Sequence, residues 1–112
     1  MNCLGKITAD PNAALFDREP EFVRFVSPLG VDGLVKVRLP RLDILAIGSS
    51  HPGSGQFRRF IVQAKTEFDT ICVWEVWNPL LKAVLPRYGF VPATDFFEGS
   101  QVSGFRWDKS NP

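Results

Sequence analysis

Histidine and cysteine are scarce in this chain of 112 residues, which contains one histidine and two cysteines. The lone His51 has no cysteine or carboxylate at ligand spacing, so the sequence predicts no metal site. Cys3 and Cys72 stand without CxxC spacing, and two cysteines do not make a disulfide framework. Because Cys72 lies inside the apolar run ICVWEVW, we expect it to be a small buried hydrophobic residue and not a nucleophile.

The chain also lacks an excess of charge of one sign and any long apolar run. Thirteen lysines and arginines against twelve aspartates and glutamates give a net charge of +1, whereas nucleic-acid and anionic-membrane binders usually carry a clear basic excess. No apolar run reaches the roughly 18–20 residues of a membrane span. The first residues, MNCLGKITAD, lack the basic start and apolar core of a signal peptide. We therefore expect a cytoplasmic protein without a membrane or nucleic-acid partner.

The composition that is present is ordinary for a globular protein, with 45% hydrophobic and 22% charged residues, which argues against disorder. We expect residues 1–112 to form a single domain. Alternating apolar and polar residues predict an antiparallel hairpin of strands 22–26 and 34–39. The continuous apolar run over 42–47 predicts a central strand that is buried on both faces. Segment 11–20 is bounded by prolines and has room for one or two helical turns.

Helical and strand-like patterns alternate in the second half of the chain. A helix is predicted over 56–65 because its apolar residues share one face: Phe57, Phe60, Ile61 and Ala64. β-Branched and aromatic residues predict strands over 71–77, 94–97 and 102–107. The sequence therefore predicts a mixed α/β domain of the α+β kind.

A second helix is predicted between strands 71–77 and 94–97. Asn78 is a suitable N-cap, and Pro79 takes the first helical position, where a missing N–H matters least. Pro86 should kink this helix or end it early, and Gly89 should stop it.

A glycine-rich loop, GSSHPGSG, lies between the central strand and the first predicted helix. A helix N-terminus favours phosphate because its N–H groups are unpaired and its dipole end is positive. Gly53 and Gly55 would let the backbone approach such a ligand, although a simple strand-to-helix turn also explains them. The loop is not a P-loop, since Gln56 follows the second glycine, and Arg58 breaks the dinucleotide-binding fingerprint.

Two motifs at a fixed separation resemble those of the GCN5-related N-acetyltransferase (GNAT) superfamily, and the resemblance covers about residues 22–107. In that family an apolar residue ends the central strand six residues before a GxG pair, as Ile47 precedes GSG at 53–55. An Asn opens the helix after the next strand, and Gly-Phe follows it by eleven residues, as with Asn78 and Gly-Phe at 89–90. The terminal GFRW is similar to the ends of very short phage-encoded members.

The resemblance implies a mostly antiparallel sheet with a central splayed strand pair and flanking helices. It implies that the central strand splays from strand 71–77 and leaves a V-shaped slot for the pantetheine arm of acetyl-CoA or another acyl-CoA. The implied cofactor contacts lie at the strand end, at the pyrophosphate-holding loop and at the Asn beside the thioester: Ala46, Ile47, Gly48, Gly53, Ser54, Gly55, Gln56, Phe57, Arg58 and Asn78. Arg58 and Arg59 are equally compatible with solvated surface side chains. No metal is implied.

The acyl transfer implied by the resemblance needs a base for the acceptor ammonium and an acid for the leaving thiolate. Leu85 occupies the position of the family's customary tyrosine acid. The candidate acid is therefore Tyr88, which is alternatively a structural ring near Gly89. The candidate bases are Glu75 and Asp43 on the strands that flank the slot, since burial or crowding raises the pKa of a carboxyl group. Each is also compatible with an ordinary outward-facing carboxylate.

The family usually places a strand and two helices before the central strand, and these helices build the acceptor wall. Here the N-terminal helical part is expected to be reduced. The acceptor site is then open to a macromolecule such as a protein, or a second copy in a homodimer completes it. Two other hypotheses stay open: a catalytically inactive GNAT-like binding or structural module, and a different α/β fold with the same spacing. A phage or mobile-element origin is an analogy only.

Overall fold

The computed structural model describes residues 3–8, 22–51, 53–76, 78–97 and 99–109. The predicted helical turns in segment 11–20 lie outside these residues. Within the described residues the chain forms one sheet and two α-helices, so the predicted mixed α+β class is confirmed.

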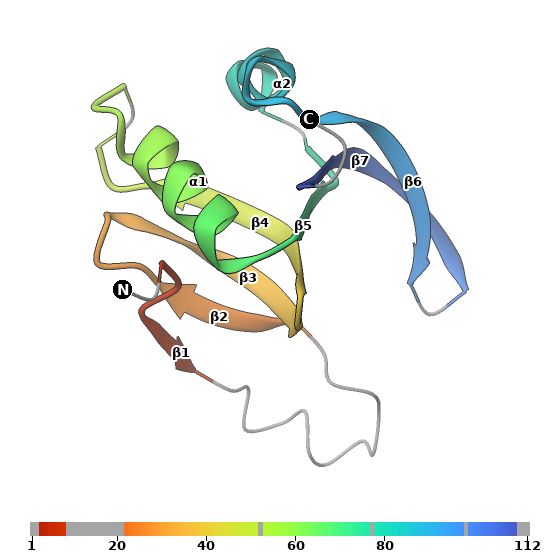
Figure 1. The fold of residues 1–112 in the computed structure, drawn as a ribbon, viewed down its shortest axis with the longest axis horizontal. Coiled ribbons are helices and arrows are strands. Elements are labelled where there is room, and N and C mark those ends of the chain that lie inside the picture. The colour runs from red at the N-terminus through yellow and green to blue at the C-terminus, as the bar shows by residue number, and fades with distance from the viewer. Residues whose placement is uncertain (1–2, 9–21, 52, 77, 98, 110–112) are drawn as a thin grey trace.

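The strands form one mostly antiparallel sheet in the order β1-β2-β3-β4-β5-β7-β6 (Figure 1). Their bounds are β1 (Lys6–Thr8), β2 (Val23–Val26), β3 (Val31–Arg38), β4 (Arg41–Ser49), β5 (Thr70–Trp74), β6 (Val91–Phe97) and β7 (Ser100–Asp108). Only β4 and β5 pair in parallel. The predicted hairpin is confirmed as β2–β3, with a shorter turn than expected because Gly30 adopts φ 87° and closes it early.

The parallel pair β4–β5 separates along its length. Residues 41–44 of β4 pair with residues 70–73 of β5, and the pairing stops at that point. Beyond Ile44, β4 continues to Ser49 in register with β3 on its other side. We call this divergence the fork. It leaves one edge of the second half of β4 without a strand partner.

The chain bends at the end of β5 and so ends this arm of the fork. The strand stops at Trp74, three residues before the predicted end at position 77. Glu75 explains the difference, because its φ of 54° lies in the left-handed region, which an extended strand cannot contain. The Glu75 N–H donates to the carbonyl of Ser103 at 2.9 Å, which holds this bend against β7.

Glycines flank both arms of the fork. A Cβ on Gly33 of β3 would lie 1.9 Å from the carbonyl oxygen of Ala46. A Cβ on Gly104 of β7 would lie 2.1 Å from the carbonyl oxygen of Val73. Real Cβ atoms do not approach backbone atoms this closely, so each neighbouring strand can follow its arm of the fork only with glycine at that position.

Helix α1 (Gln56–Glu67) covers one face of the sheet (Figure 1). Its predicted apolar face is confirmed: Phe60, Ile61 and Ala64 are buried, whereas Phe57 is half-buried. The Phe60 ring stacks on Phe25 of β2 with centroids 5.5 Å apart. These contacts build the core and fix where the N-terminus of α1 lies.

Helix α2 (Pro79–Val84) follows the bend after β5 and passes into a 3₁₀ turn, η2 (Leu85–Tyr88). The Asn78 side chain accepts a hydrogen bond from the Leu80 N–H at 2.8 Å, so the predicted N-cap is confirmed. Pro86 ends the α-helix early, as predicted, and Gly89 stops the turn with φ 89°.

Candidate functional site

Two cavities meet at the fork. The first, of about 470 Å³, lies between the two arms; we call it the fork cavity. Its lining includes Leu34, Ala46, Ile47, Trp74, Glu75 and Asn78. The second, of about 350 Å³, lies beside the glycine loop; we call it the loop cavity. Its lining includes Gly48, Gly53, Gly55, Gln56, Phe57, Arg58, Asn78 and Tyr88. Both cavities are lined by Ile47, Asn78 and Leu81, so they adjoin at these residues, and we call the two together the hollow.

Nearly all of the sequence-predicted cofactor residues line this hollow. The exception is Ser54, which lies on the other side of the loop beside Arg59, and its Oγ donates to the carbonyl of His51 at 2.6 Å. Residues that are distant in sequence, from Ala46 to Asn78, thus lie around two adjoining cavities.

The loop before α1 is held in a defined shape. Gly53 and Gly55 adopt φ values of 84° and 85°, which side chains other than glycine rarely tolerate. The Gln56 side-chain oxygen accepts a hydrogen bond from the backbone N–H of His51 at 2.9 Å and another from the Ser49 hydroxyl. The Gln56 side chain is therefore used to hold the loop in shape. A ligand in the loop cavity would contact the backbone of Gln56 and not its side chain.

The N-terminus of α1 is electrostatically positive. Among the described residues, no side chain caps it and no acidic residue lies in its first turn. The first turn instead carries Arg58 and Arg59, both exposed. Arg58 lines the loop cavity, whereas Arg59 points a guanidinium nitrogen at the Ser54 carbonyl, 3.4 Å away. The helix dipole and the Arg58 charge both favour an anion in the loop cavity.

Tyr88 also lines the loop cavity. Its ring lies 6.2 Å from the Phe57 ring, centroid to centroid. The ammonium of Lys65 donates a hydrogen bond to the Tyr88 carbonyl and lies 5.0 Å from the centroid of the Trp107 ring. Burial lowers the pKa of Lys65. Leu85, at the position of the family's tyrosine, is fully buried in the core. The 3₁₀ turn thus directs Tyr88, and not residue 85, toward the hollow.

Asp43 does not lie in the hollow. Its carboxylate is fully buried and accepts hydrogen bonds from Arg41 at 2.8 Å, Arg38 at 2.9 Å and the Trp74 indole at 2.9 Å. Burial opposes ionisation, but the hydrogen bonds from Arg41, Trp74 and Arg38 and the charge of Arg41 outweigh it, so the pKa of Asp43 lies below its usual range. The pKa therefore shifts away from neutrality, opposite to the direction that the base hypothesis requires.

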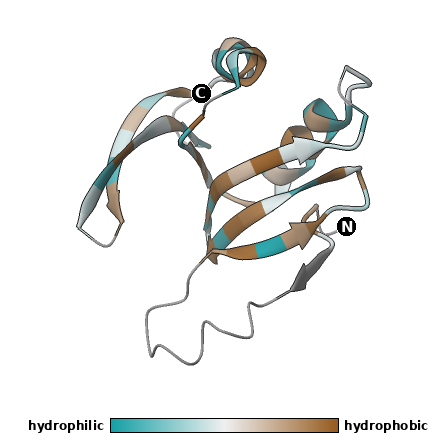
Figure 2. Ribbon diagram, turned by 180° about the vertical axis from the view of Figure 1, so that it is seen from behind, coloured by the Kyte–Doolittle hydropathy of each residue, from teal (hydrophilic) through white to brown (hydrophobic). Residues whose placement is uncertain are grey.

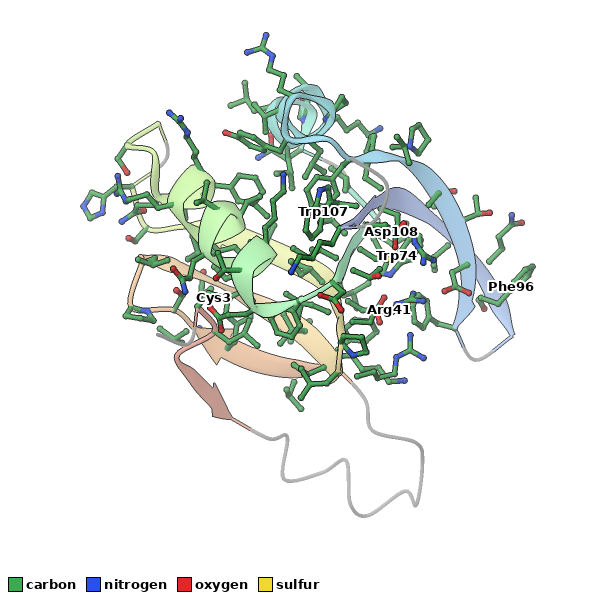
Figure 3. All side chains as sticks on the ribbon, viewed as in Figure 1. Cys3, Arg41, Trp74, Phe96, Trp107 and Asp108 are labelled. Carbon is green, nitrogen blue, oxygen red and sulfur yellow. The ribbon has the colours of Figure 1, made fainter. Side chains whose placement is uncertain are left out.

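The ion-pair network around Asp43 was not predicted from the sequence. Arg41 also pairs with Asp95 of β6 at 2.9 Å, so the network connects four strands on the sheet face that α1 does not cover. Trp74 lies in the same place, against Phe97 with ring centroids 5.7 Å apart, and Figure 3 shows Arg41 and Trp74 near the β6–β7 hairpin. One feature of the sequence indicates part of this network: Arg41 and Asp43 are two positions apart, so both side chains lie on one face of a strand.

Glu75 is the candidate base that does reach the hollow. It is half-buried and lines the fork cavity, at the positive-φ bend that ends β5. Tyr88 lines the loop cavity instead. The three predicted catalytic residues are therefore not brought together: Glu75 and Tyr88 lie in different parts of the hollow, and Asp43 lies in the ion-pair network.

Both cysteine thiols are buried. Burial is the main reason that the pKa of Cys3 rises to about 12 and that of Cys72 to about 11. Thiols with these pKa values carry almost no thiolate at neutral pH. The expectation that Cys72 is a small buried hydrophobic residue is confirmed. In the described part of the chain, no cluster of three potential metal-ligating side chains occurs. No helix there has the length and hydrophobicity to cross a membrane.

Comparison of the chain with protein-family models, with curated proteins and with solved structures gives no match.

Proposed function

We propose that this protein is an acyl-CoA-dependent N-acyltransferase of the GNAT type, transferring acetyl or another acyl group to an amine. The observation that carries the proposal is the pair of adjoining cavities, the hollow, that extends from the fork to the positive, glycine-bounded N-terminus of α1. A long ligand with a phosphate-rich end and an amide-containing arm has complementary groups along this hollow.

The two ends of such a ligand would meet different chemistry. The pyrophosphate would bind at the loop cavity, where backbone N–H groups of the first helical turn and the Arg58 charge favour anions. The pantetheine arm would lie in the fork, where the unpartnered edge of β4 around Ala46–Gly48 offers backbone donors and acceptors. Asn78, which lines both cavities, lies where the arm would pass from one to the other.

In the proposed reaction, the acceptor nitrogen attacks the thioester carbonyl carbon, a C–N bond forms and the C–S bond breaks. Glu75, at the fork cavity, takes the proton from the acceptor ammonium. The CoA thiolate takes a proton from an acid, for which Tyr88 is the candidate; because Tyr88 lines the loop cavity, this role requires the thioester to lie beside Asn78, where the two cavities adjoin. The acceptor amine would reach the thioester beside Glu75.

Calorimetric titration with acetyl-CoA and with free CoA tests the proposal. We expect micromolar dissociation constants, a binding free energy of about −8 kcal/mol. Adenosine 3′,5′-bisphosphate, which lacks the pantetheine arm, should bind more weakly, because only the loop cavity would hold it. If CoA heats match those of a buffer injection at millimolar concentration, the hollow does not bind CoA and the proposal fails.

A catalytically inactive GNAT-like binding module is the second candidate function. It is favoured by the buried Leu85 at the tyrosine position and by the separation of the three candidate catalytic side chains. Under this hypothesis the protein binds CoA but does not hydrolyse or transfer its acyl group to any tested amine, so turnover distinguishes it from an enzyme.

The Tyr88→Phe variant tests the acid. If Tyr88 protonates the thiolate, kcat should fall by about 10²-fold or more, since positioned acids contribute about 10²–10⁴-fold. The affinity for CoA should stay within about twofold, because the ring and its contact with Phe57 are retained. Free thiol released from acetyl-CoA measures the rate. Unchanged turnover at saturating substrate would remove Tyr88 from the mechanism.

A further inference from the structure

A third cavity, of about 360 Å³, opens between α2 and β7; we call it the β7 cavity. It is lined by Glu75, Val76, Lys82, Ser103, Gly104 and Phe105. Glu75 and Val76 also line the fork cavity, so the two cavities meet at the bend after β5.

Two side chains of opposite charge line the β7 cavity without pairing. Glu75 comes from the bend after β5 and is half-buried, whereas Lys82 comes from α2 and is exposed. Among the residues that the structure describes, neither side chain has a hydrogen-bond or ion-pair partner, and they do not pair with each other. A ligand that carries both an ammonium and a carboxylate would satisfy both charges at once.

The remaining lining is suited to a small organic side chain. Val76 is buried and Phe105 is half-buried, and together they give the cavity an apolar wall. Ser103 adds a hydroxyl at the rim. The cavity therefore combines an acidic group, a basic group and an apolar surface, which are the three elements that recognise an α-amino acid.

We infer that the β7 cavity binds a ligand that carries an ammonium group and a nearby carboxylate, as a free α-amino acid does, and that this ligand is the acyl acceptor. Its ammonium would lie on Glu75, where the β7 cavity meets the fork cavity, and its carboxylate on Lys82. The acceptor role rests on the proposed function. The ammonium would lose one proton to Glu75, and the amine would attack the thioester carbon. The C–S bond would then break, and the second proton of the nitrogen would leave to protonate the CoA thiolate, giving an N-acyl amino acid and CoA thiol. The same chemistry is present at a peptide amino terminus followed by an acidic residue.

Ligand-observed NMR titration of the purified protein tests the inference, with and without saturating CoA. The probes are L-leucine, leucinamide, which lacks the carboxylate, and 4-methylpentanoate, which lacks the ammonium. Leucine should bind about tenfold more tightly than either analogue, because each analogue leaves one charged side chain unpaired. A peptide amide beginning Leu-Glu, compared with one beginning Leu-Gln, separates a free amino acid from a peptide source. Equal affinity for leucine and both analogues would overturn the inference.

Variants locate the site. Glu75→Gln should weaken leucine binding about tenfold, and Lys82→Gln about threefold, because the lysine is exposed and better solvated. Lys109→Gln removes an exposed lysine outside the three cavities and should leave affinity unchanged. If Glu75→Gln and Lys82→Gln bind leucine like the wild type, the assignment is wrong.

The outcomes also separate this inference from the proposed function. CoA binding without leucine binding would overturn the β7 site and leave the acyltransferase proposal standing. Leucine binding without CoA binding would leave the β7 site standing and overturn both the acyltransferase proposal and the acceptor role.

Discussion

The Gly53→Glu variant is expected to bind CoA at least about 100-fold more weakly than the wild type, whereas Gly99→Glu should bind it normally. Gly53 lines the loop cavity, where we place the pyrophosphate. A carboxylate there would lie next to phosphate oxygens of the same charge. Repulsion at a few ångströms near a protein surface is worth a few kcal/mol, which corresponds to about 100-fold in affinity.

Gly99 is a matched control for the backbone and for the charge. Gly53 has φ 84° and Gly99 has φ 80°, and a Cβ added at either position meets no atom within 4 Å. Both glutamates therefore impose similar backbone strain, of about 1–2 kcal/mol, and the same change of net charge. The two sites differ in location, since Gly99 lies in the turn between β6 and β7. Gly55 is less suitable, because its Cβ would lie 3.3 Å from Arg59.

Calorimetry with CoA and urea unfolding of both variants separate binding from folding. Equal loss of affinity in both variants would mean that backbone strain or net charge acts on the whole protein. Retained affinity in Gly53→Glu, with the fold intact, would show that phosphate does not bind at this loop.

The Asp43→Ala variant is expected to lower the free energy of unfolding by about 1–3 kcal/mol, because it removes the buried acceptor of Arg41, which then keeps, among the described residues, only its pair with Asp95. The Trp74 indole N–H would also lose its acceptor. Asp43→Asn should have a smaller effect, since its amide oxygen can still accept from one donor. The measurement is urea unfolding followed by tryptophan fluorescence.

The Asp32→Ala variant is the control for this experiment. Asp32 pairs with Arg24 at 3.5 Å, and the two side chains are 48% and 67% exposed. An exposed pair contributes about 0–1 kcal/mol, so this variant should unfold almost like the wild type. Equal destabilisation by Asp32→Ala and Asp43→Ala would show that the buried network contributes no more to the free energy of unfolding than an exposed ion pair does.

The lowered pKa of Asp43 also predicts a pH dependence. Its contribution to stability is fully present above the pKa of an unfolded aspartate, about 3.9, and is lost as the pH falls through the lower folded pKa. The unfolding free energy of the wild type should therefore fall between about pH 4 and pH 2 more steeply than that of Asp43→Asn. Parallel curves for the two proteins would contradict the lowered pKa.

The local parts of the fold were predictable from the sequence. The apolar face of α1, the Asn78 cap with Pro79 and the stop at Gly89 depend on residues a few positions apart, and all are confirmed. The end of β5 was not predictable in this way. The pattern of ICVWEVW is that of a strand to its end, but Glu75 adopts a left-handed conformation that its own side chain does not favour.

The sequence predicted which residues line the candidate site, but it did not predict the surroundings or the pKa shift of the carboxylate Asp43. The glycine loop and the end of β4 line one hollow because each lies at the end of a predicted element. The fate of Asp43 depends on Arg38, Trp74 and Asp95, which come from three other strands. No spacing in the sequence specifies which strands become neighbours. The sequence therefore does not indicate whether the pKa of a buried carboxylate rises or falls.

The positions around the fork differ in how much substitution they tolerate. Gly33 and Gly104 leave no room for a side chain, so the angle between the arms is encoded in the backbone and tolerates little mutational drift. Leu34 and Leu45, which line the fork cavity, are not restricted in this way (Figure 2 shows the hydrophobic positions along β3 and β4). Exchanging these leucines for smaller or larger residues would reshape the space between the arms without changing the scaffold. A change of ligand size could therefore arise at two permissive positions while the fork itself stays constant.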